Sequence, residues 1–380
     1  MSLNHFEPKV LFVITEDWFF HSHFLDRAIS LLASGGAVGV ATRFSVYEEE
    51  LKSLGFTLFP VNFSRRGLNP VTEFITSLRI RRIIREFKPD ITHNVALKPV
   101  VTGTFGELLG RQKVVVNALV GMGYIFTSTD ARASLVKPLL SRILKFLLHS
   151  KSVHVVIENP DDLNSLVNDG FVEPSQISLI RGAGVNLIEF PFHPEMPGPI
   201  VVTLVSRILR DKGVLEFIEA ASRLRLSAPD VVFQIVGEPD PGNPSAIQQS
   251  EIDSWESLSN VKFLGRRNDI ARILRDSHVV CLPSYREGLP KALLEALSCG
   301  RPIITTDVPG CREVCNDSVN GLLVPARDSI ALSKAIEKLA RDAEMRQAMG
   351  RAGRLRAETE FSIEIVCAQT LDLYRKLMER

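Results

Sequence analysis

Short apolar runs alternate with amphipathic stretches from the start of this chain. The run KVLFVIT at residues 9–15 is typical of a buried parallel strand, and the helical spacing of residues 23–36 ends at two glycines. A second strand-like run, AVGVATR, follows, and the same order returns up to about residue 120. A repeated β-α-β-α order predicts one parallel sheet with helices on both faces.

The alternation stops once and then starts again. Residues 187–199, LIEFPFHPEMPGP, are aperiodic and rich in proline, which predicts a linker. The run IVVTLVSRI restarts the order at Ile200, and a chain of 380 residues has room for two or three domains. We therefore expect an α/β protein with two Rossmann-like, doubly wound parallel-sheet domains at residues 1–190 and 191–361. An amphipathic helix at 362–380 follows them.

Charge and cysteine content exclude several classes of protein. The net charge is only +1, so nothing indicates a nucleic-acid partner. Five cysteines are scattered without a CxxC pair, which favours reduced structural cysteines in a cytoplasmic protein.

No apolar run reaches eighteen residues and the N-terminus is polar up to Val10, so we expect neither a spanning helix nor a signal peptide. The first half also lacks the GxGxxG pattern of a dinucleotide site.

The stretch SYREGLPKALLEALSCG, residues 284–300, predicts a loop that leads into a helix. Pro290 suits the first helical position and Gly300 suits the residue just past the end. Two carboxylates bracket the helix start, Glu287 in the loop and Glu295 a little over one turn into the helix. The alternative is an ordinary helix with two surface acids, because acidic residues usually mark a solvated face.

The start of this helix suits a phosphate, because a helix N-terminus carries partial positive charge. The amides concerned are those around Gly288, Leu289 and Lys291. Arg207 and Lys212 lie in the loop after the strand at Ile200, and two cations beside a helix start suit a pyrophosphate, with plain surface charge as the alternative. Amides for phosphate and carboxylates for hydroxyls together predict a sugar-nucleotide site.

Glu287 and Glu295, eight positions apart with GLPKALL between them, resemble the paired-glutamate motif of the retaining family 4 glycosyltransferases. The resemblance implies that Glu287 sits by the donor sugar and Glu295 holds the nucleotide ribose. It covers about 160 residues of the second half and implies further donor contacts: Arg207 and Lys212 at the diphosphate, the backbone from Arg267 to Ile270 around the base, and the amides of Gly288, Leu289 and Lys291 at the phosphates. The implied architecture is GT-B, with two Rossmann-like domains facing across a cleft and the helix at 362–380 packing back on the first.

Motifs of the first half narrow the resemblance. SRRGLNP, KPDITH, GMGYIF, ENPDD and RGAGVN resemble the branch of the family that extends lipid-linked sugars. The implied reaction moves an N-acetylated hexosamine, or a deoxy relative, from a UDP-sugar to an undecaprenyl-diphosphate-linked saccharide in bacterial glycan assembly. The implied location is cytoplasmic, at the inner face of the plasma membrane.

One position departs from the family pattern. Many members carry a histidine in the loop after the strand that here reads VVVNALVGMG, where this chain has Asn117, Val120 and Gly121. His93 lies one strand earlier, so it either serves the acceptor or is a satisfied histidine near the sheet. The segment EDWFFHSH, residues 16–23, is expected as a loop that faces the ligand crevice or is plain surface.

Residues 133–151 form a basic amphipathic stretch. Leu135, Leu139, Ile143, Phe146 and Leu147 fall on one face, and Lys137, Arg142, Lys145 and Lys151 surround them. This pattern is typical of a helix lying on an anionic membrane surface, and the alternative is a core-packed helix with a solvated basic edge. Pro138 interrupts the pattern and marks a possible helix start.

The predicted mechanism is a retaining transfer with a departing diphosphate. No carboxylate is a clear candidate for attack on the opposite face of the sugar, so we expect front-face substitution. No DxD motif appears where a diphosphate site would need one, so we expect no metal or other cofactor. The competing hypotheses are an epimerase or phosphorylase of the same fold that needs no acceptor, and a sugar-nucleotide-binding module without transfer activity.

Overall fold

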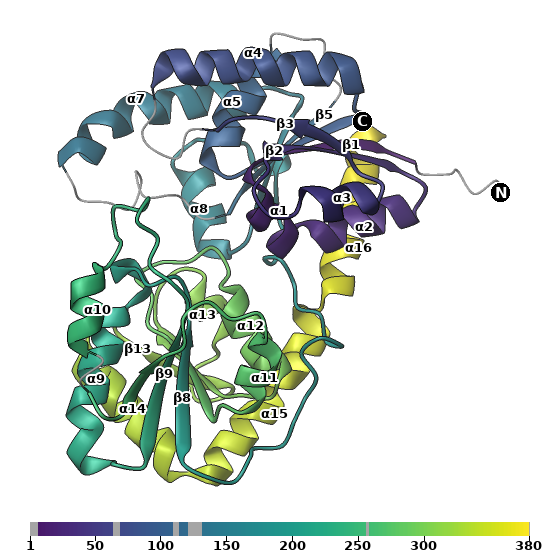
Figure 1. Cartoon of the computed structure of the whole chain (residues 1–380). Coiled ribbons are helices and arrows are strands. Elements are labelled where there is room, and N and C mark those ends of the chain that lie inside the picture. The colour runs from purple at the N-terminus through teal and green to yellow at the C-terminus, as the bar shows by residue number, and fades with distance from the viewer. Residues whose placement is uncertain (1–6, 64–68, 109–113, 121–130, 256–257, 380) are drawn as a thin grey trace. The chain divides into compact units, whose positions relative to one another are not determined.

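The computed structural model describes residues 7–63, 69–108, 114–120, 131–255 and 258–379 (Figure 1), with the side chains of 131–137 left out. Residues 64–68 of the SRRGLNP motif, the GMGYIF motif, and the side chains of Leu135 and Lys137 therefore lie outside the described residues. The chain divides into two compact units. The first unit is Met1–Ala183 with Glu364–Arg380, and the second is Gly184–Ile363.

The first unit contains a seven-stranded parallel sheet of order β3-β2-β1-β4-β5-β6-β7. Its strands are β1 (Lys9–Glu16), β2 (Ala37–Arg43), β3 (Thr57–Pro60), β4 (Ile91–Val95), β5 (Val114–Leu119), β6 (Val153–Ile157) and β7 (Ile177–Leu179). The described helices are α1 (Asp17–His23), α2 (Leu25–Ala33), α3 (Glu48–Ser53), α4 (Pro70–Phe87), α5 (Leu97–Leu108), α7 (Ala131–Leu148), α8 (Pro160–Asn168) and α16 (Ile363–Met378), with a 3-10 turn η1 (Pro174–Gln176).

Helices cover both faces of this sheet because successive strand residues point to opposite sides. In β1, Val10 and Phe12 pack with α1, α2, α3 and α16, whereas Leu11 and Val13 pack with α4. Helices α5, α7 and α8 pack on that second face, against β5 and β6. The buried Tyr374 of α16 makes the last helix of the chain part of this first core.

The second unit contains a six-stranded parallel sheet of order β10-β9-β8-β11-β12-β13. Its strands are β8 (Ile200–Val205), β9 (Val231–Val236), β10 (Val261–Phe263), β11 (Val279–Leu282), β12 (Ile303–Thr306) and β13 (Gly321–Val324). Its helices are α9 (Val214–Ser227), α10 (Gln249–Trp255), α11 (Ile270–Arg275), α12 (Lys291–Ser298), α13 (Cys311–Val314), α14 (Ser329–Arg341) and α15 (Ala343–Glu360), with a 3-10 turn η2 (Arg210–Lys212).

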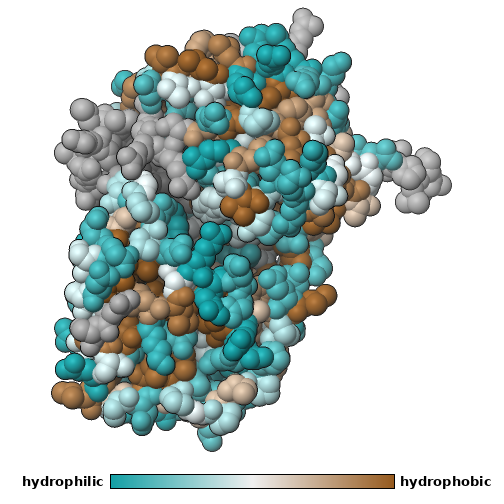
Figure 2. All heavy atoms as spheres, in the orientation of Figure 1, coloured by the Kyte–Doolittle hydropathy of each residue, from teal (hydrophilic) through white to brown (hydrophobic). Residues whose placement is uncertain are grey.

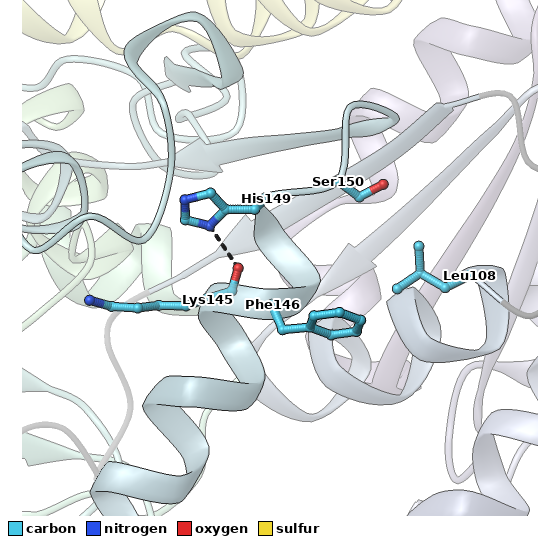
Figure 3. A pocket seen from close by; sticks show the side chains of 5 residues that line it. All are labelled: Leu108, Lys145, Phe146, His149 and Ser150. Carbon is cyan, nitrogen blue, oxygen red and sulfur yellow. Dashed lines mark hydrogen bonds between the residues drawn. The ribbon is translucent and has the colours of Figure 1, made fainter.

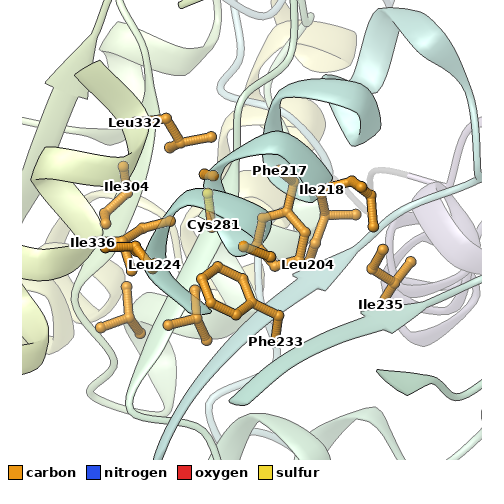
Figure 4. Packing of buried hydrophobic residues seen from close by; sticks show 14 of the residues in the cluster. Leu204, Phe217, Ile218, Leu224, Phe233, Ile235, Cys281, Ile304, Leu332 and Ile336 are labelled. Atoms are coloured by element: carbon orange, nitrogen blue, oxygen red, sulfur yellow. The ribbon is translucent and has the colours of Figure 1, made fainter. Parts of the chain in front are cut away.

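Two hydrophobic layers enclose the second sheet. On one face, Phe217 of α9 and Phe233 of β9 meet edge to face at 5.3 Å between ring centroids, beside leucines and isoleucines of α9 and α14 (Figure 4). On the other face, Leu293 and Leu297 of α12 pack with Phe361. All five cysteines lie in the described part of the chain, and each is buried and free.

Three local expectations differ from the structure. The segment at residues 16–23 forms helix α1, and Asp17 is buried with its carboxylate accepting hydrogen bonds from the amides of Ser45, Val46 and Tyr47. The first unit ends at Ala183 rather than 190, because Phe190 packs into the core of the second unit.

The third difference concerns α7, which begins at Ala131 and contains Pro138 in its interior. Its leucines at 140, 144, 147 and 148 are buried against the sheet, whereas Leu139, Ile143 and Phe146 are exposed. Leu147 therefore belongs to the buried face and not to the exposed one. None of the described helices combines the length and the apolar character that crossing a membrane requires.

Candidate active site

The strand order of the second unit reverses between β8 and β11, which are neighbours in the sheet. Loops that leave the carboxyl ends of such strands form the usual ligand crevice of a doubly wound sheet. The loop after β8 carries Arg207 and Lys212, and the loop after β11 carries Glu287. The predicted donor residues therefore lie in the two loops where a ligand site is expected.

The backbones of these two loops are in contact. Tyr285 N–H donates to the carbonyl of Asp211 at 2.9 Å. Gly213 has a positive φ of 72°, and a Cβ there would overlap the carbonyl of Pro283. The close approach thus requires glycine at position 213, and it holds Lys212 next to the loop that carries Glu287.

Lys212 and Glu287 form an ion pair with 2.6 Å between Nζ and Oε1. The hydroxyl of Ser284 donates to the same Oε1, also at 2.6 Å. The side chains of Lys212 and Glu287 are 20% and 12% exposed, so both are held by the protein and still reachable. The Glu287 amide donates to the carbonyl of Pro309 at 3.2 Å, which fixes the backbone beneath the carboxylate.

Arg207 points to a different partner. Its Nη1 lies 2.9 Å from Oδ2 of Asp240, in the loop after β9, and its side chain is 47% exposed. The structure thus brings Lys212 to Glu287 and Arg207 to Asp240. An exposed pair of this kind is weak, because solvent screens it, so the guanidinium is available to a more strongly charged ligand.

Helix α12 begins one residue later than expected. Pro290 is the residue before the helix, and its carbonyl accepts hydrogen bonds from Leu293 and Leu294 at 3.0 and 3.3 Å. The first amides of α12 have no carbonyl one turn earlier in the helix, as at any helix start. The far end agrees with the expectation, because Gly300 follows the helix with a φ of 74°.

Glu295 is nearly buried in the second turn of α12. Burial raises the pKa of Glu295 to about 6, although the ammonium of Lys291, 3.5 Å away, acts in the opposite direction. Near pH 7 the carboxylate is therefore mostly ionised and poorly hydrated. Such a group gains from any ligand that donates hydrogen bonds to it.

The loop after β10 contains the remaining donor candidates. Arg267 binds Asp269 in a bidentate pair, with Nε–Oδ1 and Nη2–Oδ2 distances of 2.8 Å. Ile270 is the first residue of α11 and packs against the core on the α12 side of the sheet. These two residues thus lie at the carboxyl edge of the same sheet as Lys212 and Glu287.

His93 lies in the first unit, within β4, and is buried in the core. Its ring stacks on Phe12 at 5.2 Å, and its Nδ1 is hydrogen-bonded to the hydroxyl of Tyr374. Burial, assisted by the positive charge of Arg27, lowers the pKa of His93 to about 3, so the ring is neutral. This geometry favours a histidine packed in the core over a residue that serves the acceptor, although only Nδ1 is hydrogen-bonded and Nε2 is buried without a partner among the described residues.

Sequence reasoning missed a cluster under the Glu287 loop. The hydroxyl of Tyr285 donates to Oε1 of Glu216 in α9 at 2.7 Å, and the guanidinium of Arg327 lies 4.5 Å from the centre of the Tyr285 ring. Burial, and then the hydrogen bond to Glu216, raises the pKa of Tyr285, so it remains a donor. Only the position of Tyr285 beside the glutamate motif could have drawn attention to it.

Possible metal ligands do not gather anywhere in the described part of the chain. No three His, Cys, Asp or Glu side chains there form a group that could hold a metal ion. The described site is instead made of cations, carboxylates and backbone amides. Chemically it can neutralise an anionic ligand and accept hydrogen bonds from hydroxyl groups.

Two family models match the chain, one in each half. Residues 9–163 match the model described as Glycosyl transferase 4-like, and residues 188–356 match the model described as Glycosyl transferases group 1. The second match includes every donor-site residue described above.

Curated relatives extend over most of the chain. One is the N,N'-diacetylbacillosaminyl-diphospho-undecaprenol alpha-1,3-N-acetylgalactosaminyltransferase of Campylobacter jejuni, 28% identical over 88% of this chain and 89% of the relative. Another is the UDP-Gal:alpha-D-GlcNAc-diphosphoundecaprenol alpha-1,3-galactosyltransferase of Escherichia coli, 27% identical over 73% of each chain.

The fold is shared with a solved enzyme structure. Sucrose-phosphate synthase from Thermosynechococcus elongatus aligns with a TM-score of 0.81 over 98% of this chain and 100% of its own, at 19% identity. The two parallel sheets and this likeness confirm the predicted fold class, two Rossmann-like domains of the GT-B type.

Proposed function

Since the chain belongs to the glycosyltransferases, its first half to the 4-like family and its second half to group 1, we propose that it transfers a hexosamine-type sugar from a UDP-sugar to an undecaprenyl-diphosphate-linked saccharide. The configuration at the anomeric carbon is retained. The second unit binds the donor and the first unit binds the acceptor.

The observation that carries this proposal is the Lys212–Glu287 pair at the β8/β11 switch point. A cation that meets a carboxylate beside a helix start is suited to a ligand with a diphosphate and a sugar. The two curated relatives are named for transfer to diphospho-undecaprenol-linked acceptors, which supports the acceptor class. They are named for different sugars, N-acetylgalactosamine and galactose. The choice of an N-acetylated sugar for this chain rests on the resemblance of its first-half motifs.

Each donor group has a proposed role. Lys212 and Arg207 neutralise the diphosphate, together with the amides of Gly288, Leu289 and Lys291. Glu287 orients the donor sugar by accepting hydrogen bonds from its hydroxyls, and Glu295 does the same for the ribose. The backbone from Arg267 to Ile270 frames the uracil base.

We propose that the transfer is a front-face substitution. The bond between the anomeric carbon and the diphosphate oxygen breaks first, and the acceptor hydroxyl forms its bond on the same face. The hydroxyl proton passes to the departing diphosphate oxygen, so no base from the protein is required. Lys212 and Arg207 stabilise the charge that develops on the diphosphate, where preorganised donors have their largest effect.

The same cations are proposed to make a divalent metal unnecessary for turnover. A chelator such as EDTA should leave the rate of transfer unchanged. Loss of activity with the chelator and its recovery with manganese would contradict this part of the proposal.

The lipid-linked acceptor implies a membrane location, which we propose to be peripheral and on the cytoplasmic side. Helix α7 is suited to that contact, since it exposes Leu139, Ile143 and Phe146 beside the exposed cation Arg142. Its buried leucines hold it on the first sheet at the same time, so the proposed membrane contact and the core packing concern different faces of one helix.

A transfer assay with the purified full chain tests the proposal. UDP-N-acetylhexosamines should raise the melting temperature and give product on a detergent-solubilised undecaprenyl-diphosphate-linked saccharide. Lys212→Ala should remove most of the rise in melting temperature and most of the product. Release of UDP or a changed sugar without any acceptor would indicate the epimerase or phosphorylase instead, and thermal stabilisation without transfer would indicate a binding module.

A further inference from the structure

Helix α4 exposes a stripe of large apolar side chains to solvent. The stripe, called here the α4 stripe, consists of Val71, Phe74, Ile75 and Leu78, which are between 41% and 67% exposed. Their spacing of three, four and seven residues places them on one side of the helix. The opposite side of α4 is already used, because Ile80, Ile83 and Phe87 are buried on the sheet. Figure 2 shows hydrophobic side chains gathered over α4.

The α4 stripe continues onto the neighbouring helices. Phe74 meets Phe105 of α5 edge to face at 6.2 Å between ring centroids. One turn later on α5, Leu108 is also exposed. Leu108 and Phe146 of α7 line one open depression of about 570 Å³, and their side chains point toward each other across it (Figure 3). We call the α4 stripe together with Phe105, Leu108 and Phe146 the apolar band.

Positive charge accompanies the apolar band. Helices α4, α5 and α7 together contain nine Lys and Arg against three Glu, a net charge of +6 in a chain whose total is only +1. Arg82 and Arg85 are exposed and extend the α4 stripe along the same side of the helix. Of the three acids, Glu73 is paired with Lys98 at 3.0 Å, Glu107 is buried, and Glu86 is exposed next to Arg85.

We propose that the apolar band is a docking face for an anionic phospholipid bilayer. Exposed aromatic and aliphatic side chains with arginines beside them are suited to the boundary between acyl chains and headgroups. Phe74, Ile75 and Phe146 enter that boundary, and Arg82, Arg85 and Arg142 meet the lipid phosphates. The inference deepens the proposed function, because it rests on a lipid-linked acceptor and extends the membrane contact from α7 to α4 and α5.

The test is co-sedimentation of the full chain with vesicles that contain no lipid-linked saccharide. The chain should bind vesicles made of equal parts phosphatidylglycerol and phosphatidylcholine, and bind phosphatidylcholine alone far more weakly. Added salt should weaken the binding, because headgroup attraction is screened. The double variant F74E/I75E, and separately Phe146→Glu, should each lower the affinity at least about tenfold. Leu226→Glu is the matched control, since Leu226 is 87% exposed on α9 of the second unit and should bind like wild type.

Three outcomes would overturn the docking face. One is wild-type vesicle binding by the band variants. Another is an equal loss in the Leu226→Glu control. The third is a wild-type dimer in sedimentation velocity that the double variant dissociates without vesicles, which would make the band a contact between copies of the chain. UDP should still raise the melting temperature of the band variants, which shows that they are folded. Vesicle binding by a chain that transfers no sugar would reject the proposed function and leave the docking face standing.

Discussion

Lys212 Nζ lies 2.6 Å from Glu287 Oε1, and the two residues come from loops after the neighbouring strands β8 and β11. Ser284 donates to the same oxygen, so the pair is part of a fixed arrangement. A bound diphosphate would offer Lys212 a partner with more charge, and Glu287 would then be free to accept hydrogen bonds from the sugar. Under the proposed function, the pair is the arrangement of the site before a donor binds.

The first prediction separates the roles of Lys212 and Glu287. Lys212→Ala and Glu287→Gln should each lower kcat/KM by about 100-fold, as removal of one preorganised charge-stabilising group often does. If the two residues hold different parts of the donor, the losses should multiply in the double variant. A double variant no worse than either single one would show that they act only as a pair.

Arg207 allows a matched comparison within the same loop. Arg207→Ala should also cost about 100-fold in turnover, because its exposed pair with Asp240 leaves the guanidinium available to the diphosphate. Arg210→Ala is the control, since Arg210 pairs with Glu251. Equal losses in the two variants, measured with the same UDP-sugar, would argue against a special role for Arg207.

The second prediction concerns Tyr285 as a positioning residue for Glu287. Tyr285→Phe keeps the ring beneath Arg327 but removes the hydrogen bond to Glu216. A hydrogen bond to a charged group contributes about 1.5–3 kcal/mol to stability. Its loss should loosen the loop that carries Glu287 and lower kcat by about tenfold. The dissociation constant of UDP should change little, because Lys212 and Arg207, which are proposed to bind the diphosphate, are unchanged. Glu216→Gln retains an acceptor and should keep most of the activity, and a fall in UDP affinity equal to that in kcat would contradict the positioning role.

The third prediction is a pH dependence of nucleotide binding. Burial raises the pKa of Glu295 to about 6, and the ionised carboxylate accepts hydrogen bonds from the ribose hydroxyls more strongly than the protonated acid does. The affinity for UDP should therefore fall as the pH is lowered through about 6. Glu295→Gln should bind more weakly at pH 8 and lose this dependence, which calorimetry at several pH values would measure. A Gln variant that keeps the wild-type pH profile would assign the titration to another group.

Local sequence signals predicted the elements that carry the site. Helix α4 spans Pro70–Phe87 because Asn69 caps its start and Lys88, with a φ of 52°, precedes a proline at its end. Lys212 and Glu287 were predictable because each follows an apolar strand at a recognisable loop. Both sheets were predictable because short apolar strands alternate with amphipathic helices along the chain.

Tertiary contacts explain what the sequence could not predict. Tyr285, Glu216 and Arg327 come from three separate segments, and no local pattern joins them. Helix α1 has only seven residues, too few for a periodicity to be seen. His93 was ambiguous because burial decides between its two roles, and burial depends on α16, almost 300 residues later in the chain, which supplies Tyr374.

The last prediction concerns stability and the buried Glu107 of α5. Burial raises the pKa of Glu107 to about 8, so the folded chain holds a proton that the unfolded chain releases near its ordinary pKa of 4.5. The folded state therefore binds more protons between those two values, and the free energy of unfolding should fall as the pH rises through this range. The slope for one proton is at most about 1.4 kcal/mol per pH unit. In Glu107→Gln this contribution is absent. As the pH rises from 6 to 8, the free energy of unfolding of the variant, measured in urea, should therefore increase relative to that of wild type. Glu86→Gln on the exposed side of α4 is the control and should follow wild type, and a Glu107→Gln variant with the wild-type slope would show that the carboxyl is not protonated in the folded chain.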